Sequence, residues 1–256
     1  MRQFSARILS NEQLCQSMYQ VRLQGTSGTE TGKPGQFLTV RITQSVVPLL
    51  RRPFALSHNE PEDRFSFIYQ VRGAGTDLLS TFGRGTELDI IGPLGIPFPL
   101  PAPGEFSLLV AGGIGLGPIL FLADTLRHRG CEFSFVFGCR SAAFFPEAVF
   151  ENHDTVVCTD DGSSGFSGNV VEYLESVSGE LSLKTRIYCC GPEPMLKGCH
   201  QFAGRHGFLC HVSVEQVMAC GVGACMGCAV RLADTVSYAR ACREGPVFDS
   251  RELAWD

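Results

Sequence analysis

Four cysteines near the end of the chain restrict most strongly what this polypeptide can fold into. Cys220, Cys225, Cys228 and Cys242 follow the spacing C-x4-C-x2-C-x13-C, which is the plant-type arrangement of ligands for a 2Fe–2S cluster. A four-residue loop followed by a two-residue loop lets three thiolates converge on one cluster. The distant fourth cysteine completes the ligand set from the other side of the cluster. Glycines interleaved with the ligands allow the backbone to fold tightly and to aim N–H groups at the sulfurs. The spacing therefore predicts a cluster-binding segment with these four ligands.

Two other interpretations of these cysteines stay open at this point. A structural zinc site usually has two C-x2-C pairs, whereas this segment has one such pair and a four-residue loop that zinc leaves unexplained. Free buried cysteines are also common, although chance seldom produces this spacing. Seven of the other cysteines are expected to be small core residues: Cys15, Cys131, Cys139, Cys158, Cys189, Cys199 and Cys210.

Charge and hydropathy limit where the chain works. Residues Met1–Leu14 carry charged side chains and have no apolar core of a secretory signal, so a cytoplasmic, reducing compartment is expected. The net charge is −5 and no basic cluster extends beyond Arg51 and Arg52, which argues against a nucleic-acid partner. Phe106–Ala123 is uncharged and long enough to span a membrane, but its central glycines and proline favour a strand, a loop and a helix start. No membrane partner is therefore expected.

The pattern of residues divides the chain into a β part, an α/β part and a short tail. Residues 1–100 are predicted to form an antiparallel β-barrel, because short runs rich in β-branched and aromatic residues alternate with glycine and proline. One brief helix is expected at Thr76–Phe82. The expected strands are Met18–Leu23, Gln36–Arg41, Arg64–Tyr69 and Glu87–Ile90.

After a linker at Pro99–Gly104, residues 101–208 are predicted to form a nucleotide-binding α/β domain around a parallel sheet. The expected strands are Ser107–Ala111, Phe133–Gly138, Thr155–Cys158 and Arg186–Cys190, and the expected helices are Pro118–His128, Asn169–Ser176 and Pro194–His206. Residues 209–256 are too few to bury a core of their own. They are expected to form a small 2Fe–2S cluster segment that a metal or another surface must order.

Two features of the first part can bind phosphate. Arg52 can hold a pyrophosphate through two parallel hydrogen bonds from the end of an apolar strand. Gly73 and Gly75 precede the short helix, so their N–H groups are free to face phosphate oxygens. Taken alone, the same residues fit a surface arginine and an ordinary turn equally well.

A glycine loop opens the α/β domain. Gly112, Gly113 and Gly115 follow a buried strand and precede a helix, which is the arrangement of a pyrophosphate cradle at a helix N-terminus. The string GGIGLGP is not a strict G-x-G-x-x-G, but its place at the start of a strand–helix alternation supports nucleotide binding. Asp160 and Asp161 end a later strand, where they fit either a ribose contact that favours NAD over NADP or an ordinary turn.

The arginine strand and the later glycine-rich helix start, both within a β-barrel, resemble the ferredoxin–NAD(P)H reductase superfamily. The resemblance implies that Arg52 binds the pyrophosphate of FAD. It also implies further FAD contacts from Pro53, Phe54, Ala55, Tyr69, Gln70, Val71, Gly75 and Thr76. The chain departs from the superfamily at Ala55, where a serine or threonine is usual; Ser57 lies one step along the same strand face.

The same resemblance bears on the second nucleotide. It implies that the loop of Gly112, Gly113 and Gly115 receives NAD(P)H. Cys190 and Gly191 begin the string CGPEPM, which is similar to the superfamily's C-G-P-x-P-M element, whose cysteine approaches the nicotinamide.

The order of the three parts predicts an electron-transfer role. A nicotinamide donates two electrons together and a 2Fe–2S cluster accepts one, whereas a flavin takes two and releases them singly. The segment after residue 208 is less than half the roughly 100 residues of an ordinary domain. The electrons are therefore expected to pass to or from a separate partner protein.

The tail resembles most specifically the electron-transfer subunits of NAD-linked (class 1B) dihydroorotate dehydrogenases. The strings MACGVGACMGC and, after the fourth cysteine, GPVFD carry this resemblance. It implies a separate FMN-containing catalytic subunit that oxidises dihydroorotate, in a heterotetramer of two of each chain. Electrons would then reach NAD through the cluster and FAD, as a step of de novo pyrimidine (UMP) biosynthesis.

Other functions share these motifs. A flavin and iron–sulfur subunit of a hydrogenase, a sulfite reductase or a ferredoxin:NADP oxidoreductase is the main alternative, and the identity of the co-purifying partner distinguishes it. A redox sensor without turnover is a second alternative, which NADH-dependent reduction of a dye would exclude.

Overall fold

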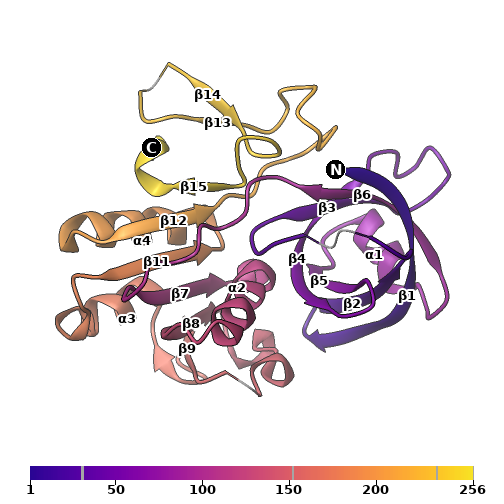
Figure 1. The fold of residues 1–256 in the computed structure, drawn as a ribbon. Helices are drawn as coiled ribbons and strands as arrows, with labels where there is room; N and C mark the ends of the chain where they lie inside the picture. The colour runs from indigo at the N-terminus through magenta and orange to yellow at the C-terminus, as the bar shows by residue number, and fades with distance from the viewer. Residues whose placement is uncertain (30–31, 152, 235, 256) are drawn as a thin grey trace.

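The computed structural model describes residues 1–29, 32–151, 153–234 and 236–255. These residues form a closed β-barrel beside a mainly parallel sheet, and a small C-terminal segment lies over the junction between them (Figure 1). The architecture confirms the predicted combination of an antiparallel barrel, a nucleotide-binding type of sheet and a small tail.

Six antiparallel strands close the barrel in the order β1-β2-β5-β4-β3-β6. They are β1 (Arg2–Cys15), β2 (Met18–Gly25), β3 (Phe37–Arg41), β4 (Arg52–Glu60), β5 (Arg64–Gln70) and β6 (Glu87–Leu94), and the helix α1 (Ala74–Ser80) follows β5. Alternate residues of β6 are buried, as expected for a strand with one face toward a core. Inside the barrel, the rings of Phe54 and Phe67 stack with their centroids 4.5 Å apart.

The strand β1 is the main element that the sequence did not predict. Only Ala6 and Ile8 of its fourteen residues are buried, so the strand lacks the apolar alternation by which strands are recognised. Pairing with β2 on one side and β6 on the other holds it in the barrel.

Seven strands form the central sheet in the order β10-β9-β8-β7-β11-β12-β15. The strands are β7 (Phe106–Gly112), β8 (Phe133–Cys139), β9 (Thr155–Thr159), β10 (Phe166–Ser167), β11 (Thr185–Cys190), β12 (Leu209–Ser213) and β15 (Val247–Asp249), and only β15 pairs antiparallel. The helix α2 (Leu116–His128) covers one face, and α3 (Val170–Ser176) and α4 (Glu193–His206) cover the other. Short 3-10 helices are η1 (Gly113–Gly115), η2 (Ala142–Phe144), η3 (Glu147–Phe150), η4 (Ser178–Glu180) and η5 (Ser250–Glu252).

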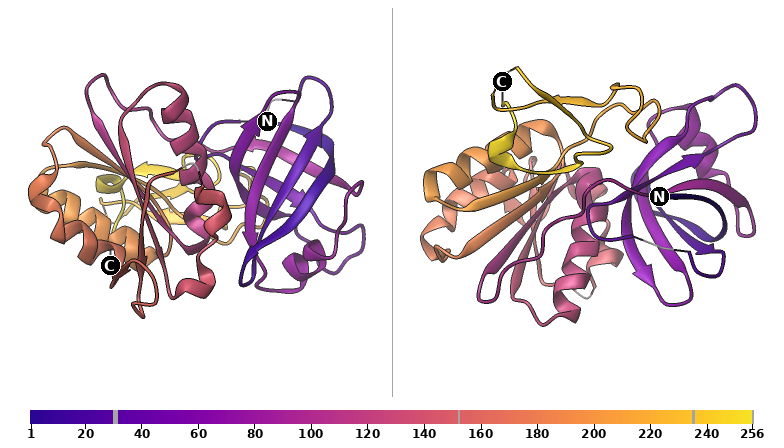
Figure 2. Two further views of the ribbon diagram at one scale, coloured as in Figure 1. Left: turned by 90° about the horizontal axis from the view of Figure 1, so that it is seen from below. Right: turned by 45° about the horizontal axis from the view of Figure 1, so that its top comes forward.

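The uncharged stretch Phe106–Ala123 divides as the sequence predicted, into β7, the turn η1 and the first part of α2. Among the described residues, no helix combines the length and apolar character needed to cross a membrane. The helix α2 instead lies between the sheet and the barrel, where it runs along β4 (Figure 2).

The C-terminal segment is built into the sheet. The strands β12 and β15 belong to the sheet although both follow residue 208, so the sheet crosses the predicted boundary between residues 101–208 and 209–256. Between them lies a hairpin of β13 (Ala229–Arg231) and β14 (Tyr238–Arg240). Phe37 and Leu94 of the barrel share one apolar core with Cys228 and Cys242. The chain's own barrel and sheet therefore supply the surface on which this segment packs.

Candidate cofactor and iron–sulfur sites

A cavity of about 220 Å³ lies where the barrel, the sheet and the C-terminal segment meet. We name it the junction cavity. Its lining includes Phe37, Pro53, Phe54, Ala55, Tyr69, Gln70, Arg72, Ile114, Pro118, Cys190, Glu215, Met218 and Pro246. Residues predicted from two separate motifs, the arginine strand and the CGPEPM string, thus line one cavity.

Arg52 is the first residue of β4 and follows a loop rather than an apolar strand, contrary to the prediction. Leu49 and Leu50, which precede Arg52 in this loop, are exposed. The guanidinium of Arg52 lies against the start of α1: a Cβ on Gly75 would be 3.0 Å from Arg52 Nε. A glycine at this position therefore lets the arginine and the first turn of the helix approach each other, as a shared phosphate site requires.

The loop before α1 is held by Thr76, whose Oγ1 accepts the N–H groups of Arg72 at 2.9 Å and Gly73 at 3.2 Å. The N–H of Gly73 is therefore already bonded within the chain, and the prediction that it is free for phosphate was wrong. Thr76 shapes the loop that places Gly75 beside Arg52.

The predicted flavin residues of β4 and β5 alternate in direction. Pro53, Phe54 and Ala55 line the junction cavity, but the ring of Phe54 is also part of the barrel core. Tyr69 also points inward, and its hydroxyl donates to Asn11 Oδ1 at 3.1 Å. Gln70 faces the cavity and donates to Ser17 Oγ at 3.1 Å.

Two further residues of this region lie outside the lining of the junction cavity. Val71 packs against the barrel core. Ser57, the nearest hydroxyl to the position where the superfamily has serine or threonine, is buried with its Oγ 2.8 Å from Ser66 Oγ. The wall at Ala55 is therefore apolar, and Ser57 supplies no hydroxyl to it.

The glycine loop lies at the carboxyl end of β7, at the point where the strand order of the sheet reverses. Ligands of open α/β sheets bind at such points. A Cβ on Gly115 would lie 2.1 Å from the backbone oxygen of Cys190, and one on Gly112 would lie 2.5 Å from Met195 Sδ. These close approaches join the loop after β7 to Cys190 and Gly191 after β11, while Gly113 has the positive φ of 52° that favours glycine.

A second cavity of about 560 Å³, the edge cavity, opens along this end of the sheet. Its lining includes Gly112, Gly113, Gly138, Arg140, Asp160, Asn169, Pro192 and Met195. Asp160 thus lines the cavity, whereas Asp161 is a turn residue whose Oδ1 accepts the N–H of Ser163 at 3.0 Å. A larger cavity, of about 910 Å³, lies at the opposite end of the strands and contains none of the predicted cofactor residues.

The junction and edge cavities adjoin, because Gln70, Arg72, Ile114 and Glu215 line both of them. Sequence reasoning missed Glu215. The side chain of Glu215 is exposed to solvent in the cavities. Desolvation by the surrounding protein raises the pKa of its carboxyl, and this outweighs the lowering by the charge of Arg72. The signal that could have found it is its place as a lone charge in the apolar string HVSVEQVMAC.

Cys190 is fully buried beside this carboxyl. Burial, followed by the charge of Glu215, raises the pKa of its thiol far above the usual value, so the neutral thiol is the form present. A neutral thiol of the junction cavity therefore lies beside a carboxyl group that lines both cavities, at the position that the resemblance assigned to the nicotinamide.

The four predicted cluster ligands come together as two pairs. The thiol of Cys220 interacts with that of Cys225, and the thiol of Cys242 interacts with that of Cys228. Among the described residues, no three His, Cys, Asp or Glu side chains converge on one point as a single metal ion would require. Two separate pairs instead suit a cluster of two irons, because each iron of a four-cysteine 2Fe–2S cluster takes two thiolates.

The backbone around Cys220 and Cys225 donates N–H groups to their sulfurs, as thiolates require. Sγ of Cys220 accepts the N–H groups of Val222 at 3.5 Å and Ala224 at 3.4 Å, and Sγ of Cys225 accepts that of Gly227 at 3.4 Å. Burial raises the pKa of Cys220, but these and neighbouring hydrogen bonds outweigh it and bring that pKa to about 6. N–H groups aimed at sulfur also tune an iron–sulfur cluster, so the donor set fits that group.

The loop that carries Cys220, Cys225 and Cys228, which we call the cysteine loop, touches the barrel. A Cβ on Gly221, whose φ is 68°, would lie 2.6 Å from Thr39 Cγ2 on β3. Phe37 on the same strand lines the junction cavity, as do Met218 and Pro246 from the C-terminal segment. The cysteine loop and the junction cavity are therefore neighbours, with β3 between them.

Comparisons with known proteins agree with this geometry. Residues 215–254 match the family of the iron–sulfur cluster binding domain of dihydroorotate dehydrogenase B. The electron transfer subunit of dihydroorotate dehydrogenase B (NAD(+)) from Bacillus caldolyticus is 38% identical over 253 residues, which cover 96% of each chain. The corresponding subunit from Caldanaerobacter subterraneus subsp. tengcongensis is 36% identical over 97% of each chain.

Solved structures give the same result for the fold. A structure of the NADH-dependent reduced ferredoxin-NADP oxidoreductase superposes with a TM-score of 0.85 and 26% identity, covering 98% of this chain and 90% of that one. Phthalate dioxygenase reductase superposes with a TM-score of 0.68 at 19% identity, which supports the fold alone. From the identity and coverage of its relatives, the chain belongs to the family of electron transfer subunits of the oxidoreductase dihydroorotate dehydrogenase B.

Proposed function

We propose that this chain carries electrons between NAD and a separate FMN-containing dihydroorotate dehydrogenase catalytic subunit, through FAD and a 2Fe–2S cluster, in de novo pyrimidine biosynthesis. One observation carries the proposal: the junction cavity adjoins the edge cavity on one side and the cysteine loop on the other. The relatives named above as dihydroorotate dehydrogenase subunits supply the partner. The complex is proposed to be a cytoplasmic heterotetramer with two copies of each chain.

The three groups divide the chemistry, since the nicotinamide exchanges electrons in pairs, the cluster exchanges them singly and the flavin does both. The chain positions them. Arg52 and the start of α1 hold the FAD pyrophosphate, and Pro53 and Ala55 form the apolar wall beside the ring. Phe54, Tyr69, Val71 and Thr76 support that wall and its loop from the barrel side.

The remaining predicted residues serve the other two groups. The loop of Gly112, Gly113 and Gly115 is proposed to receive the pyrophosphate of NAD at the edge cavity, which Gly112 and Gly113 line, while Gly115 packs against the backbone of Cys190. Cys190 and Gly191 are proposed to border the nicotinamide. Cys220, Cys225, Cys228 and Cys242 are the proposed cluster ligands. Because Cys225 is exposed whereas Cys228 and Cys242 are buried, the Cys220–Cys225 edge is proposed to face the catalytic partner.

Co-expression with a candidate catalytic subunit tests the function. The purified complex should show combined flavin and iron–sulfur absorbance, should bleach with NADH, and should reduce NAD with dihydroorotate as the electron donor. Bleaching by NADH without dihydroorotate activity, together with reduction of NADP that requires both NADH and reduced ferredoxin, would instead favour the ferredoxin-NADP oxidoreductase function of the structural relative.

Replacing Arg52 with alanine should weaken retention of FAD. Hydrogen bonds to charged groups contribute about 1.5–3 kcal/mol each, so we expect the dissociation constant for FAD to rise about tenfold to a hundredfold. Flavin content per chain and fluorescence titration of released FAD measure the effect. The neighbouring Arg51 is the control, because its Nη1 donates to the backbone oxygen of Asp89 at 2.7 Å. Equal flavin content in Arg52→Ala and Arg51→Ala would contradict the assignment.

Replacing Glu215 with glutamine should slow reduction of the flavin by NADH about tenfold, because this carboxylate stands where the nicotinamide and flavin cavities meet. Stopped-flow absorbance of the complex measures the rate. Glu193→Gln is the matched control, since Glu193 is exposed at the start of α4 and lines neither cavity. Equal rates in both variants would remove Glu215 from the site.

A further inference from the structure

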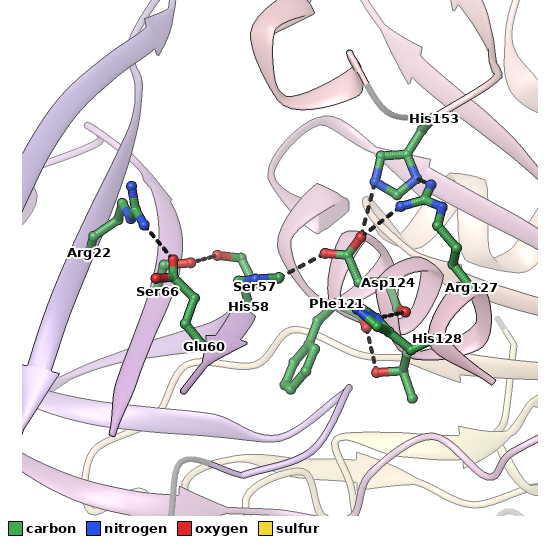
Figure 3. Close-up of polar contacts among 11 residues, drawn as sticks. Arg22, Ser57, His58, Glu60, Ser66, Phe121, Asp124, Arg127, His128 and His153 are labelled. Carbon is green, nitrogen blue, oxygen red and sulfur yellow. Dashed lines mark hydrogen bonds and ion pairs between the residues drawn. The ribbon is translucent and has the colours of Figure 1, made fainter. Parts of the chain in front are cut away.

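We propose that His58 and Asp124 are positioning residues that hold the barrel and the sheet in register, and so set how fast the flavin is reduced by NADH. The inference rests on the function proposed above. It concerns a polar contact between β4 and α2 whose residues line neither cavity (Figure 3).

The need for such a contact follows from how the site is divided. The flavin strand, with Arg52 and Ala55, is part of β4 in the barrel. The glycine loop leads directly into α2 of the other part of the chain. Since electron donor and acceptor are held by different parts, their alignment depends on the contact of α2 with β4.

Apolar packing fixes one part of this contact. At the start of α2, a Cβ on Gly117 would lie 3.5 Å from Ser57 Cβ and 3.8 Å from the backbone oxygen of Ala55. One turn later, Phe121 is 7% exposed and belongs to the core of the barrel. Apolar contacts of this kind are non-directional, so they bring the two parts together without fixing how one slides along the other.

A directional contact follows on the next turn of α2. Asp124 Oδ2 lies 2.8 Å from Nδ1 of His58, which is on β4. Oδ1 of Asp124 accepts from Arg127 Nη1 at 3.1 Å and lies 3.3 Å from Nε2 of His153. We call His58, Asp124, Arg127 and His153 the Asp124 network; three of its members belong to the sheet part and one belongs to the barrel.

Contacts within the sheet part alone already orient the carboxylate of Asp124. Nη2 of Arg127 lies 2.6 Å from Nδ1 of His153, and because arginine can only donate, this nitrogen must accept. Nε2 of His153 then donates to Asp124. Its side chain is 5% exposed and its ring packs edge-on against Phe135. The carboxylate is therefore held with Oδ2 turned toward the barrel, where His58 completes it.

Charges around His58 favour its protonated form. Asp124 faces it from α2, Glu60 from its own strand, and Arg22, which pairs with Glu60 at 2.6 Å, from β2. The hydrogen bond to Asp124 raises the pKa of His58, burial opposes this, and the charges of Asp124 and Glu60 support it, whereas the charge of Arg22 lowers that pKa. The pKa of Asp124 lies well below its usual range, because the bonds from His153 and His58 outweigh its burial.

The contact of His58 with Asp124 is expected to weaken as pH rises. A group whose pKa is raised in the folded state contributes its full stabilisation below its unfolded pKa, and loses it as pH rises through the folded pKa. The contact of His58 with Asp124 is therefore an ion pair at lower pH and becomes a neutral hydrogen bond as pH rises above the raised pKa of His58. Alignment of the two parts should loosen over the same interval.

The test uses the full chain in complex with its catalytic subunit, as wild type and as the variants His58→Gln, His58→Ala and Asp124→Asn. Stopped-flow absorbance gives the limiting rate of flavin reduction and the dissociation constant for NADH between about pH 6 and pH 9. Hydrogen–deuterium exchange of peptides covering β4 and α2 reports the contact itself. His206→Gln is the control, because His206 Nε2 lies 3.5 Å from Glu175 Oε2 within the sheet part alone.

We expect the wild-type limiting rate to fall as pH rises through the pKa of His58. We expect His58→Ala and Asp124→Asn to lower that rate about threefold to tenfold, with little change in NADH affinity and with faster exchange in both β4 and α2. His58→Gln keeps a hydrogen-bond donor without the charge. Its limiting rate should therefore lie between that of the wild type and those of His58→Ala and Asp124→Asn, and it should not depend on pH in this range. His206→Gln should match the wild type.

Wild-type limiting rates in His58→Ala with unchanged exchange would overturn the positioning role. Lower thermal stability in the variants with an unchanged limiting rate would also overturn it, because the network would then be structural only. A wild-type complex whose flavin NADH does not reduce contradicts the proposed function instead, so the two failures are distinguishable.

Discussion

Cys225→Ser is expected to abolish the iron–sulfur absorbance of the complex and to stop electron transfer between the flavin and the catalytic subunit. The thiolate is the ligand that iron requires, and Cys225 forms one of the two thiol pairs. NADH should still reduce the flavin and a dye such as ferricyanide, because the junction and edge cavities contain none of the four cysteines. Iron and acid-labile sulfide per chain, the visible spectrum and dihydroorotate-dependent NAD reduction measure the three effects.

The same variant should loosen the C-terminal segment, because ligand binding contributes to the order of small metal-binding segments. Faster proteolysis between β12 and β15 would show this. Cys131→Ser is the matched control, since Cys131 is a half-buried cysteine at the edge of the core beneath α2. Full iron content in Cys225→Ser, or equal loss of iron in Cys131→Ser, would contradict the ligand assignment.

Gly115→Ala is expected to give the second-largest effect, on both stability and use of NADH. The added methyl group would lie 2.1 Å from the backbone oxygen of Cys190 and 2.6 Å from the backbone nitrogen of Gly191. Backbone atoms cannot turn aside as a flexible side chain can, so β7 and β11 must separate. We expect a loss of about 3 kcal/mol in the free energy of unfolding and about a hundredfold slower flavin reduction by NADH.

Denaturant unfolding and stopped-flow absorbance measure the two effects of Gly115→Ala. Gly204→Ala is the control with the opposite sign. Gly204 lies inside α4, and a Cβ there meets no atom within 4 Å. Alanine at that position should stabilise the chain by about 0.5–1 kcal/mol. A Gly115→Ala variant as stable and as fast as wild type would show that the two loops do not need to touch.

The parts of the site that the sequence predicted are those whose signals are local. Thiol ligands separated by two or four residues must lie close in space, so the Cys220–Cys225 pair follows from spacing alone. A strand, a glycine loop and a helix in succession place Gly112 and Gly115 at the end of a parallel sheet. Each of these motifs is complete within one short run of residues.

The parts that the sequence could not show depend on contacts between distant segments. Glu215 becomes a site residue only because β12 ends beside Cys190, which follows from the pairing of β11 with β12. His58 and Asp124 are 66 positions apart and belong to no motif. The strand β1 has few buried side chains and is held by its neighbours on both sides. In each case the information is in the tertiary arrangement rather than in any window of sequence.

The way in which the C-terminal segment leaves the sheet has a consequence for how members of this family can diverge. Ser213 at the end of β12 and Val247 at the start of β15 are partners in the sheet, so the excursion between them departs and returns at a single point. A loop whose two ends are already adjacent changes its closure entropy only slowly with length. The metal-carrying part can therefore lengthen, shorten or be exchanged as a cassette, while the rest of the sheet keeps its register and the nicotinamide side keeps its shape.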